Sequence, residues 1–216
     1  MEKLRLGVLI SGRGSNLQAL IDATSDPAYP AEIVLVIANR ADAGGLARAK
    51  AASIPTLVIP HGQFSDREAF DMALDEALHA AGVDLVCLAG FMRLLTETFA
   101  ERWRDRLVNI HPSLLPAFKG LDAHAQALAA GVRISGCTVH FVRPAMDAGP
   151  IIVQAAVPVM TGDDESSLSA RILEAEHLCY PLAVRLIAEG RVQVVGDQAG
   201  IAGAATASKP LINPRA

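Results

Sequence analysis

The stretch "LRLGVLISGRGSNLQAL", Leu4 to Leu20, joins a short apolar run to a glycine loop and an amphipathic segment. The run Leu4–Ile10 is almost continuously apolar, as in a strand that is covered on both faces of a parallel sheet. Gly12 and Gly14 follow it, and residues 15–25 then repeat apolar side chains with the period of a helix. This strand–loop–helix unit predicts the beginning of an α/β fold.

The same alternation continues along the chain. Further strand-like runs are Ile33–Ala38, Thr56–Ile59, Leu85–Ala89 and Leu107–Ile110, and further helical segments lie near 43–52, 65–81 and 96–103. The helical segment 65–81 begins with "SDRE", in which Ser65 and Glu68 have the spacing of a capping box. Alternation of this kind predicts a doubly wound, mostly parallel sheet of the Rossmann-like type.

The pattern changes in the C-terminal part of the chain. "ISGCTVHFV" and "PIIVQAAVPV" are strand-like and are joined by a connection with glycine and proline, which predicts a pair of antiparallel strands. A long helix is expected from about Asp163 to about Ala188, before Gly190, and "VQVV" is a candidate for a last short edge strand. We expect one domain over residues 1–195 and a flexible tail over 196–216, which is rich in Ala, Gly and Pro without periodicity.

Composition excludes several classes of protein. The 216 residues are 51% hydrophobic, which is enough for a sizeable core in one or two domains. The net charge is −4 and no basic stripe is present, so we expect no nucleic-acid partner. The apolar runs are shorter than the roughly 18 residues of a membrane span, and we expect neither a span nor a secretory signal. Cys87, Cys137 and Cys179 are scattered, which predicts reduced core thiols in a cytoplasmic protein and no metal site.

The glycine loop does not match the common nucleotide-binding patterns. A dinucleotide fingerprint would have a third glycine where Leu17 stands and an acidic residue after the second strand, which ends in "IANR". The Gly-Lys-Ser/Thr of a Walker motif is absent as well. The amides of Gly14, Ser15 and Asn16 at a helix N-terminus suit one phosphate or another compact anion. The alternative is a tight turn in which Ser15 or Asn16 only caps the helix.

Polar residues follow the fifth strand-like run, in "NIHPSLLPAFKG" at positions 109–120. Asn109 and His111 lie at a carboxyl strand end, where open α/β sheets place their ligand crevice, and Pro112 disfavours a helix at His111. An Asn amide can stabilise a developing oxyanion, and a His can transfer a proton near neutral pH. Asp147, in the turn "MDAGP", is a candidate partner that would favour the charged form of the His111 imidazole.

Each of these polar residues also has an ordinary structural interpretation. Asn-x-His and Asp-x-Gly-Pro are both common turn sequences. His140 lies inside an apolar strand and fits a buried histidine with a hydrogen-bond partner, whereas the sequence suggests no partner for His61 or His79. "GxSxG" does not occur, and no Cys lies near a His in a charged setting, so direct transfer with proton handling fits better than a covalent mechanism.

Several motifs occur in order along the chain, namely "VLISGRGSNLQALIDA", "DREAFD", "LAGFMRLL", "NIHPSLLP", "VHFV", "DAGPIIVQAAVPV" and "EAEHLCYPLAV". Together they resemble the phosphoribosylglycinamide formyltransferases, a folate-dependent formyltransferase family, over nearly the whole globular part. The resemblance implies transfer of a formyl group from 10-formyltetrahydrofolate to the amine of phosphoribosylglycinamide. The products would be formylglycinamide ribonucleotide and tetrahydrofolate, in de novo purine (IMP) biosynthesis, without a metal and without a covalent enzyme intermediate.

The resemblance also implies the residues of the site. Asn109, His111 and Asp147 would be the catalytic residues. The substrate-binding residues would be Gly14, Ser15 and Asn16, which bind the phosphate, and Glu176, which faces the ribose hydroxyls. The folate-binding residues would be Arg67, Met92, Arg93, Leu94, Leu95, Asn109, Arg143 and Asp147.

The chain departs from the family pattern at a few positions. Leu173 stands where the family usually has a polar amide, which puts one polar substrate contact in doubt. Lys119 and Asp122 stand where many relatives have Pro and His, and we expect this to change only the loop surface. We expect small-molecule partners only, in a monomer or a homodimer.

Three other functions share some of these features. Formyl transfer to methionyl-tRNA would require an added nucleic-acid module, and hydrolysis of the formyl donor would have no use for a phosphate loop. A non-catalytic phosphate-binding module would keep Gly14–Asn16 but would not need His111 with Asp147.

Overall fold

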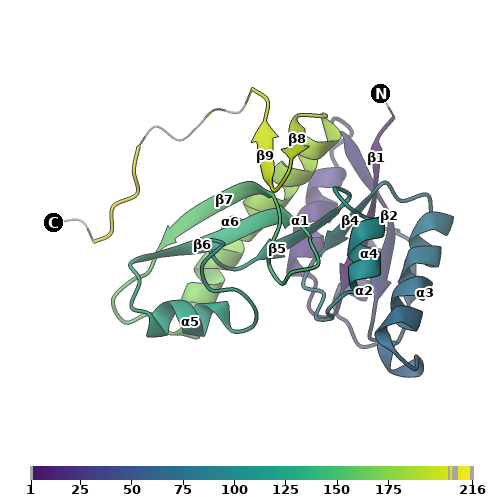
Figure 1. The fold of residues 1–216 in the computed structure, drawn as a ribbon, viewed down its shortest axis with the longest axis horizontal. Coiled ribbons are helices and arrows are strands. Elements are labelled where there is room, and N and C mark those ends of the chain that lie inside the picture. The colour runs from purple at the N-terminus through teal and green to yellow at the C-terminus, as the bar shows by residue number, and fades with distance from the viewer. Residues whose placement is uncertain (1, 204, 206–208, 215–216) are drawn as a thin grey trace. The chain divides into compact units, whose positions relative to one another are not determined.

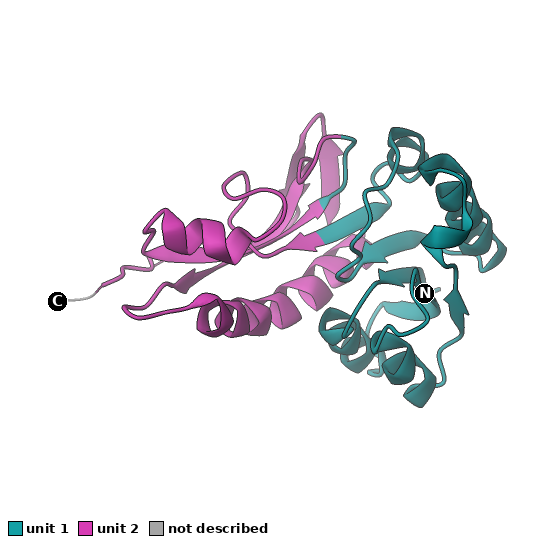
Figure 2. Ribbon diagram, turned by 90° about the horizontal axis from the view of Figure 1, so that it is seen from below, with its two compact units in different colours: residues 1–109, 141–144 teal, residues 110–140, 145–216 magenta. Residues whose placement is uncertain are grey.

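The computed structural model describes residues 2–203, 205 and 209–214, and these residues belong to two compact units. Unit 1 comprises Met1–Asn109 and Phe141–Pro144, and unit 2 comprises Ile110–His140 and Ala145–Ala216 (Figure 2). The assignment of residues 1–195 to one domain stays a prediction. The expected flexibility of positions 204, 206–208, 215 and 216 lies outside the described residues.

The central element is a seven-stranded sheet with the order β3-β2-β1-β4-β5-β6-β7. The strands are β1 (Leu4–Ile10), β2 (Ala31–Ala38), β3 (Thr56–Val58), β4 (Leu85–Leu88), β5 (Leu107–His111), β6 (Ile134–Phe141) and β7 (Ile151–Pro158). β1 pairs in parallel with β2 and β4, β2 with β3, and β4 with β5, whereas β6 and β7 are antiparallel, with Val139 opposite Val153. The mostly parallel sheet and the antiparallel pair are therefore confirmed.

Helices connect the strands (Figure 1). They are α1 (Ser15–Thr24), α2 (Gly45–Ala51), the 3-10 turn η1 (His61–Gln63), α3 (Arg67–Ala80), α4 (Glu97–Arg102), α5 (Ala123–Ala129) and α6 (Glu165–Ala188). Within unit 1, α1 lies beside α2 and α3 beside α4, and the two pairs cover opposite faces of the strands (Figure 2). The long helix α6 is confirmed and ends before Gly190, whose φ of 66° suits glycine at a helix end. None of the described helices has the length and apolar character that crossing a membrane requires.

The core of unit 1 explains why α3 lies on the sheet. Phe70 and Leu74 of α3 are buried against Leu9 of β1, and Trp103 beside them is fully covered. Burial of each such side chain contributes about 2 kcal/mol. The indole Nε1 of Trp103 donates to the Asp75 carboxylate at 2.9 Å, so its one polar group is also paired.

The start of α3 corrects one prediction from the sequence. The N-cap is Asp66 and not Ser65, because the Asp66 carboxylate accepts the Ala69 amide at 2.8 Å, and Ser65 Oγ donates to that carboxylate. Both residue types can cap a helix, and Asp66 does so because the helix begins one residue later than expected. A capping box occurs instead at α6, between Asp164 and Ser167.

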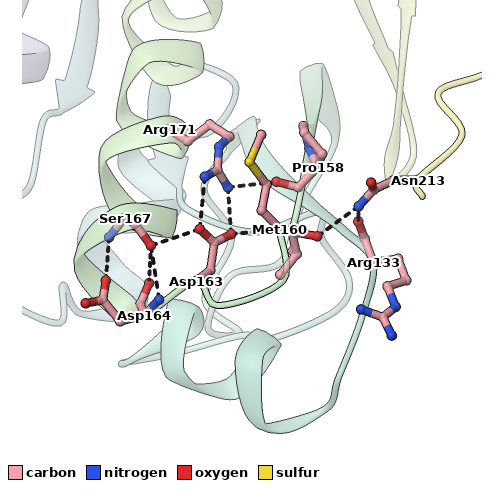
Figure 3. A network of polar contacts seen from close by, with 9 residues as sticks. Arg133, Pro158, Met160, Asp163, Asp164, Ser167, Arg171 and Asn213 are labelled. Atoms are coloured by element: carbon pink, nitrogen blue, oxygen red, sulfur yellow. Dashed lines mark hydrogen bonds and ion pairs between the residues drawn. The ribbon is translucent and has the colours of Figure 1, made fainter. Parts of the chain in front are cut away.

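A network of charged and polar groups fixes the turn between β7 and α6 (Figure 3). Asp163 accepts two N–H groups of Arg171, at 2.8 and 3.0 Å, and the Met160 amide at 2.7 Å. The Arg171 guanidinium, together with that amide, holds the pKa of the Asp163 carboxyl well below its usual range. Asn213 Nδ2 donates to the Arg133 carbonyl at 2.6 Å, which ties the C-terminal segment to the residue that precedes β6 (Figure 3).

The C-terminal strands differ from the expectation. "VQVV" forms β8 (Val192–Val195), which pairs antiparallel with β9 (Gln198–Ile201) in a separate two-stranded sheet and is not an edge of the main sheet. The strand β9 lies inside the segment that the sequence predicts to be a flexible tail. The turn between the two strands contains Gly196, with φ 60°, which suits a tight hairpin. The sequence of β9, QAGI, has no apolar run, so sequence reasoning did not detect this strand.

Candidate functional site

The glycine loop leads directly into α1. Gly14 is the N-cap residue with φ 72°, and no described side chain caps the helix, so Ser15 and Asn16 do not act as its caps. A Cβ atom at Gly14 would lie 2.5 Å from Gly45 Cα, which explains why only glycine fits there. The first amides of a helix lack partners within the helix, so this N-terminus presents N–H donors and the positive end of the helix dipole.

A cavity of about 520 Å³ lies beside this loop in unit 1. Its lining comes from the glycine loop and from residues that follow β2, β3 and β4, namely Ser11, Gly12, Arg13, Gly14, Ser15, Asn16, Asn39, Arg40, His61, Ala89, Gly90, Met92 and Arg93. Three of these residues are arginines and one is a histidine, and no carboxylate is among the described residues of the lining. The cavity has the size of a small-molecule site and a charge that favours an anion.

His61 and Asn39 are members of this cavity that sequence reasoning missed. His61 Nδ1 lies 3.1 Å from the Asn39 carbonyl oxygen and 3.2 Å from Asn39 Nδ2. Asn39 follows β2 and His61 follows β3, and the carboxyl ends of parallel strands meet at one edge of a sheet. That position after a strand end is the signal that could have identified both residues.

His111 is the last residue of β5 and is only 5% exposed. Its Nε2 donates to the Phe118 carbonyl at 2.9 Å, and its Nδ1 lies 3.5 Å from Asp147 Oδ1. Both neighbours are oxygen atoms that accept hydrogen bonds, so the ring serves both of them only when both nitrogens carry a proton. The structure thus brings His111 and Asp147 together at the carboxyl end of β5.

The Asp147 carboxylate is held by the backbone around it. Its Oδ2 accepts the Gly120 amide, and Asp147 itself has a φ of 44°, a conformation that Asp tolerates better than most residues. Gln126 Nε2 donates to the carbonyls of Lys119 and Leu121, which fixes the loop that carries Gly120. The loop from Phe118 to Leu121 therefore supports the His111–Asp147 pair, a role that sequence reasoning did not detect.

Asn109 and Glu176 are both placed on regular elements. Asn109 is half-buried on β5, opposite Leu88 of β4, and it precedes His111 by two residues, so both side chains leave the same face of the strand. Glu176 is buried on α6. The pKa of the Cys137 thiol is raised, first because that thiol donates a hydrogen bond to Cys179, then by burial and by the charges of Cys179 and Glu176. All three cysteines are buried thiols, as the sequence predicts.

The residues expected to bind folate have different environments. Met92 and Leu94 are large apolar side chains that are 70% and 54% exposed, and the Met92 amide donates to Ser11 Oγ at 2.8 Å. Arg67, at the start of α3, and Arg93 are exposed.

Two other expected folate residues, Leu95 and Arg143, contact neighbouring groups of unit 1. Leu95 is half-buried against the core of unit 1. The Arg143 guanidinium donates to the Asp105 carboxylate at 2.6 Å and to the Val142 carbonyl at 3.2 Å.

Two further histidines, His140 and His79, have structural surroundings. His140 is buried in β6, as expected. His79, for which the sequence suggested no partner, lies 3.3 Å from Asp75 and against the Trp103 ring. No group of three or more His, Cys, Asp or Glu side chains within the described part of the chain is placed to hold a metal ion.

Comparison with known proteins gives a family match and similar solved structures. The family model described as "Formyl transferase" matches residues 4–184. The chain is 44% identical to phosphoribosylglycinamide formyltransferase of Escherichia coli, over 93% of this chain and 94% of that protein. The crystal structure of glycinamide ribonucleotide transformylase 1 from Symbiobacterium toebii superimposes with a TM-score of 0.90 at 52% identity, and the match covers 92% of this chain and 94% of that one.

A second group of relatives is much longer than this chain. The chain is 54% identical to the trifunctional purine biosynthetic protein adenosine-3 of Gallus gallus over 89% of its own length. It spans only 19% of that protein.

Proposed function

The chain belongs to the formyl transferase family, and on that premise we propose that it transfers a formyl group from 10-formyltetrahydrofolate to the amine of phosphoribosylglycinamide. The products are formylglycinamide ribonucleotide and tetrahydrofolate. The likeness to the Escherichia coli enzyme over nearly the full length of both chains supports this acceptor. The observation that carries the proposal is the imidazole of His111, which lies between the Asp147 carboxylate and the Phe118 carbonyl at the end of β5.

The acceptor is proposed to bind through its phosphate and its ribose. The amides of Gly14, Ser15 and Asn16 would donate to the phosphate, and the left-handed Gly14 and the cationic cavity beside it support this role. The buried carboxylate of Glu176 would accept the ribose hydroxyls. Leu173, which lies one helical turn before Glu176, would give an apolar contact where relatives place a polar one.

The folate would bind with its apolar rings against Met92 and Leu94. The exposure of these two side chains supports the proposal, because large apolar groups that face solvent often mark a ligand surface. Arg67 and Arg93 are exposed cations that suit the carboxylates of a glutamate tail. Main-chain groups from Leu95 and from Arg143 to Asp147 would bind the pterin ring.

The proposed chemistry is direct attack of the acceptor amine on the formyl carbon. Negative charge then develops on the formyl oxygen, where the Asn109 amide and the His111 imidazolium would stabilise it. One such donor is typically worth about 3 kcal/mol of barrier. Because both nitrogens of His111 already face acceptors, one of these contacts must be exchanged for the formyl oxygen during transfer.

Asp147 is proposed to act through its charge and through a proton. Its carboxylate stabilises the imidazolium of His111, and it would position a water molecule that carries the amine's proton to the leaving nitrogen of the folate. No covalent enzyme intermediate is needed. The proposed cytoplasmic location and the state of assembly, monomer or homodimer, do not affect this scheme.

The proposed function predicts that loss of the formyl group from the folate depends on the phosphorylated acceptor. Release of tetrahydrofolate, followed by absorbance, should require phosphoribosylglycinamide. The dephosphorylated acceptor should show a KM that is higher by about 100-fold, because it loses several charge-assisted hydrogen bonds to the loop. Equal KM values would contradict the role of Gly14–Asn16, and deformylation without any acceptor would show a hydrolase.

A further inference from the structure

The loop of residues 91–95, between β4 and α4, carries exposed side chains that are proposed to bind the folate. Met92, Arg93 and Leu94 are exposed, whereas Phe91 and Leu95 on either side of them pack against the core of unit 1. These residues belong to neither a helix nor a strand. Contacts with neighbouring elements must therefore fix the conformation of the loop.

Two adjacent residues of α3 contact the two ends of this loop. The Phe70 ring stacks on the Phe91 ring, with the ring centroids 6.4 Å apart and an angle of 10° between the planes. Asp71 Oδ2 accepts the Thr96 amide at 2.6 Å. Thr96 is also the N-cap of α4, since its Oγ1 accepts the Phe99 amide at 3.3 Å. One turn of α3 thus holds the loop at both of its ends.

Asp71 is a costly residue for a position inside the core. It is 3% exposed, and its Oδ1 has no hydrogen-bond partner among the described residues. Burial raises the pKa of the Asp71 carboxyl, and hydrogen bonds from the Thr96 amide and hydroxyl oppose that shift. A buried carboxylate with an unpaired oxygen destabilises a folded chain. The benefit of Asp71 therefore lies in what it holds, and not in the stability of the core.

The same helix carries a second part of the proposed folate surface. Arg67 is exposed and lies one helical turn before Asp71, and residues four positions apart are neighbours on a helix. A loop that is fixed to Asp71 is thereby also fixed in its position relative to Arg67. The cation proposed for the glutamate tail and the apolar side chains proposed for the rings then keep one spacing.

We propose that Asp71 is a positioning residue for the formyl donor: through Thr96 it fixes the loop of residues 91–95 against the helix that carries Arg67. Phe70 holds the other end of the loop by stacking on Phe91. Asp71 acts through the loop and does not itself contact the folate. The assignment of the loop to folate rests on the proposed function, whereas the anchoring of the loop by Asp71 does not.

Two substitutions of similar size separate the hydrogen bond from the packing. Asp71→Leu removes the acceptor of the Thr96 amide, whereas Asp71→Asn keeps an oxygen for it. Hydrogen–deuterium exchange of the intact protein, followed by mass spectrometry, should be about tenfold faster over residues 91–96 in Asp71→Leu. The KM for 10-formyltetrahydrofolate should rise about tenfold in this variant, and the KM for the acceptor should change by less than about twofold. Asp71→Asn should restore both properties to within about threefold of the unaltered protein.

The matched control is Asp75→Leu, one turn further along α3. Asp75 is also buried, but it accepts hydrogen bonds from Arg102 and Trp103 at the other end of α4. Its loss should lower the melting temperature, because the Trp103 N–H loses its acceptor, and should leave the exchange of residues 91–96 and the donor KM unaltered.

The outcomes distinguish the anchoring from the proposed function. Unaltered exchange of residues 91–96 in Asp71→Leu, or an equal increase in Asp75→Leu, would overturn the positioning role. The same holds if Asp71→Asn fails to restore the slow exchange. Faster exchange together with an unaltered donor KM would leave the anchoring in place, and it would show that the loop is not part of the folate site.

Discussion

Replacement of His111 by Ala is expected to lower kcat for formyl transfer by about 10³-fold or more, with a much smaller effect on the KM of either substrate. The imidazolium is proposed to stabilise negative charge that exists only in the transition state, so its loss raises the barrier and leaves ground-state binding nearly intact. A single preorganised donor is worth roughly 10²–10³ in rate, and the positive charge adds to that. Stopped-flow or steady-state absorbance of the released tetrahydrofolate measures the effect.

His111 is buried, so its removal needs a control for folding. His111→Gln serves this purpose, since its amide can still donate to the Phe118 carbonyl but carries no charge. We expect the melting temperature of His111→Gln to lie within a few degrees of that of the unaltered protein. Its kcat should still fall to a small fraction of the unaltered value. A turnover near that of the unaltered protein in either variant would remove His111 from the mechanism.

Asp147→Asn is expected to reduce kcat by about 10²- to 10³-fold. The amide has nearly the shape of the carboxylate, and its oxygen can still accept the Gly120 amide, so the loop should keep its conformation. What the substitution removes is the negative charge that faces His111 Nδ1 and that would position the water molecule carrying the proton. The loss should therefore appear in kcat and not in the melting temperature.

Asp122→Asn is the matched control for this substitution. Asp122 also has a positive φ, of 56°, and lies in the same unit, and its side chain makes no cap hydrogen bond to the described part of α5. Its change to Asn should leave both turnover and melting temperature unaltered. Equal losses in Asp122→Asn and Asp147→Asn would point to a general effect of charge and would contradict the specific role of Asp147.

Local sequence patterns were sufficient to predict most of the strands and helices of the fold. The β1 strand begins and ends where its apolar run does, since a strand covered on both faces needs little more than that run. The α5 helix was missed because it lies between glycine-containing loops and its sequence, AHAQALA, is mostly alanine, so no period of large apolar side chains shows. The Asp66 cap was misplaced because Ser65 and Asp66 are adjacent and both suit that position.

The candidate site was less accessible to sequence reasoning, because it depends on contacts between distant segments. The turn "MDAGP" indicated that Asp147 could reach His111, but the Phe118 carbonyl became a partner only through a backbone with φ 52°, which no residue pattern announces. His61 and Asn39 were missed for a related reason. Their contact depends on the neighbouring positions of β2 and β3 in the sheet. In the sequence, His61 is an isolated histidine after Pro60, and nothing there indicates that it contacts Asn39.

The most direct test of the account follows the carbon atom that is transferred. The protein is incubated with 10-formyltetrahydrofolate labelled with carbon-13 in the formyl group and with phosphoribosylglycinamide, and the products are examined by mass spectrometry and NMR. The account predicts one labelled formyl group on the glycinamide nitrogen for each tetrahydrofolate released. Label recovered as free formate, or an acceptor that stays unlabelled while the folate is consumed, would contradict it.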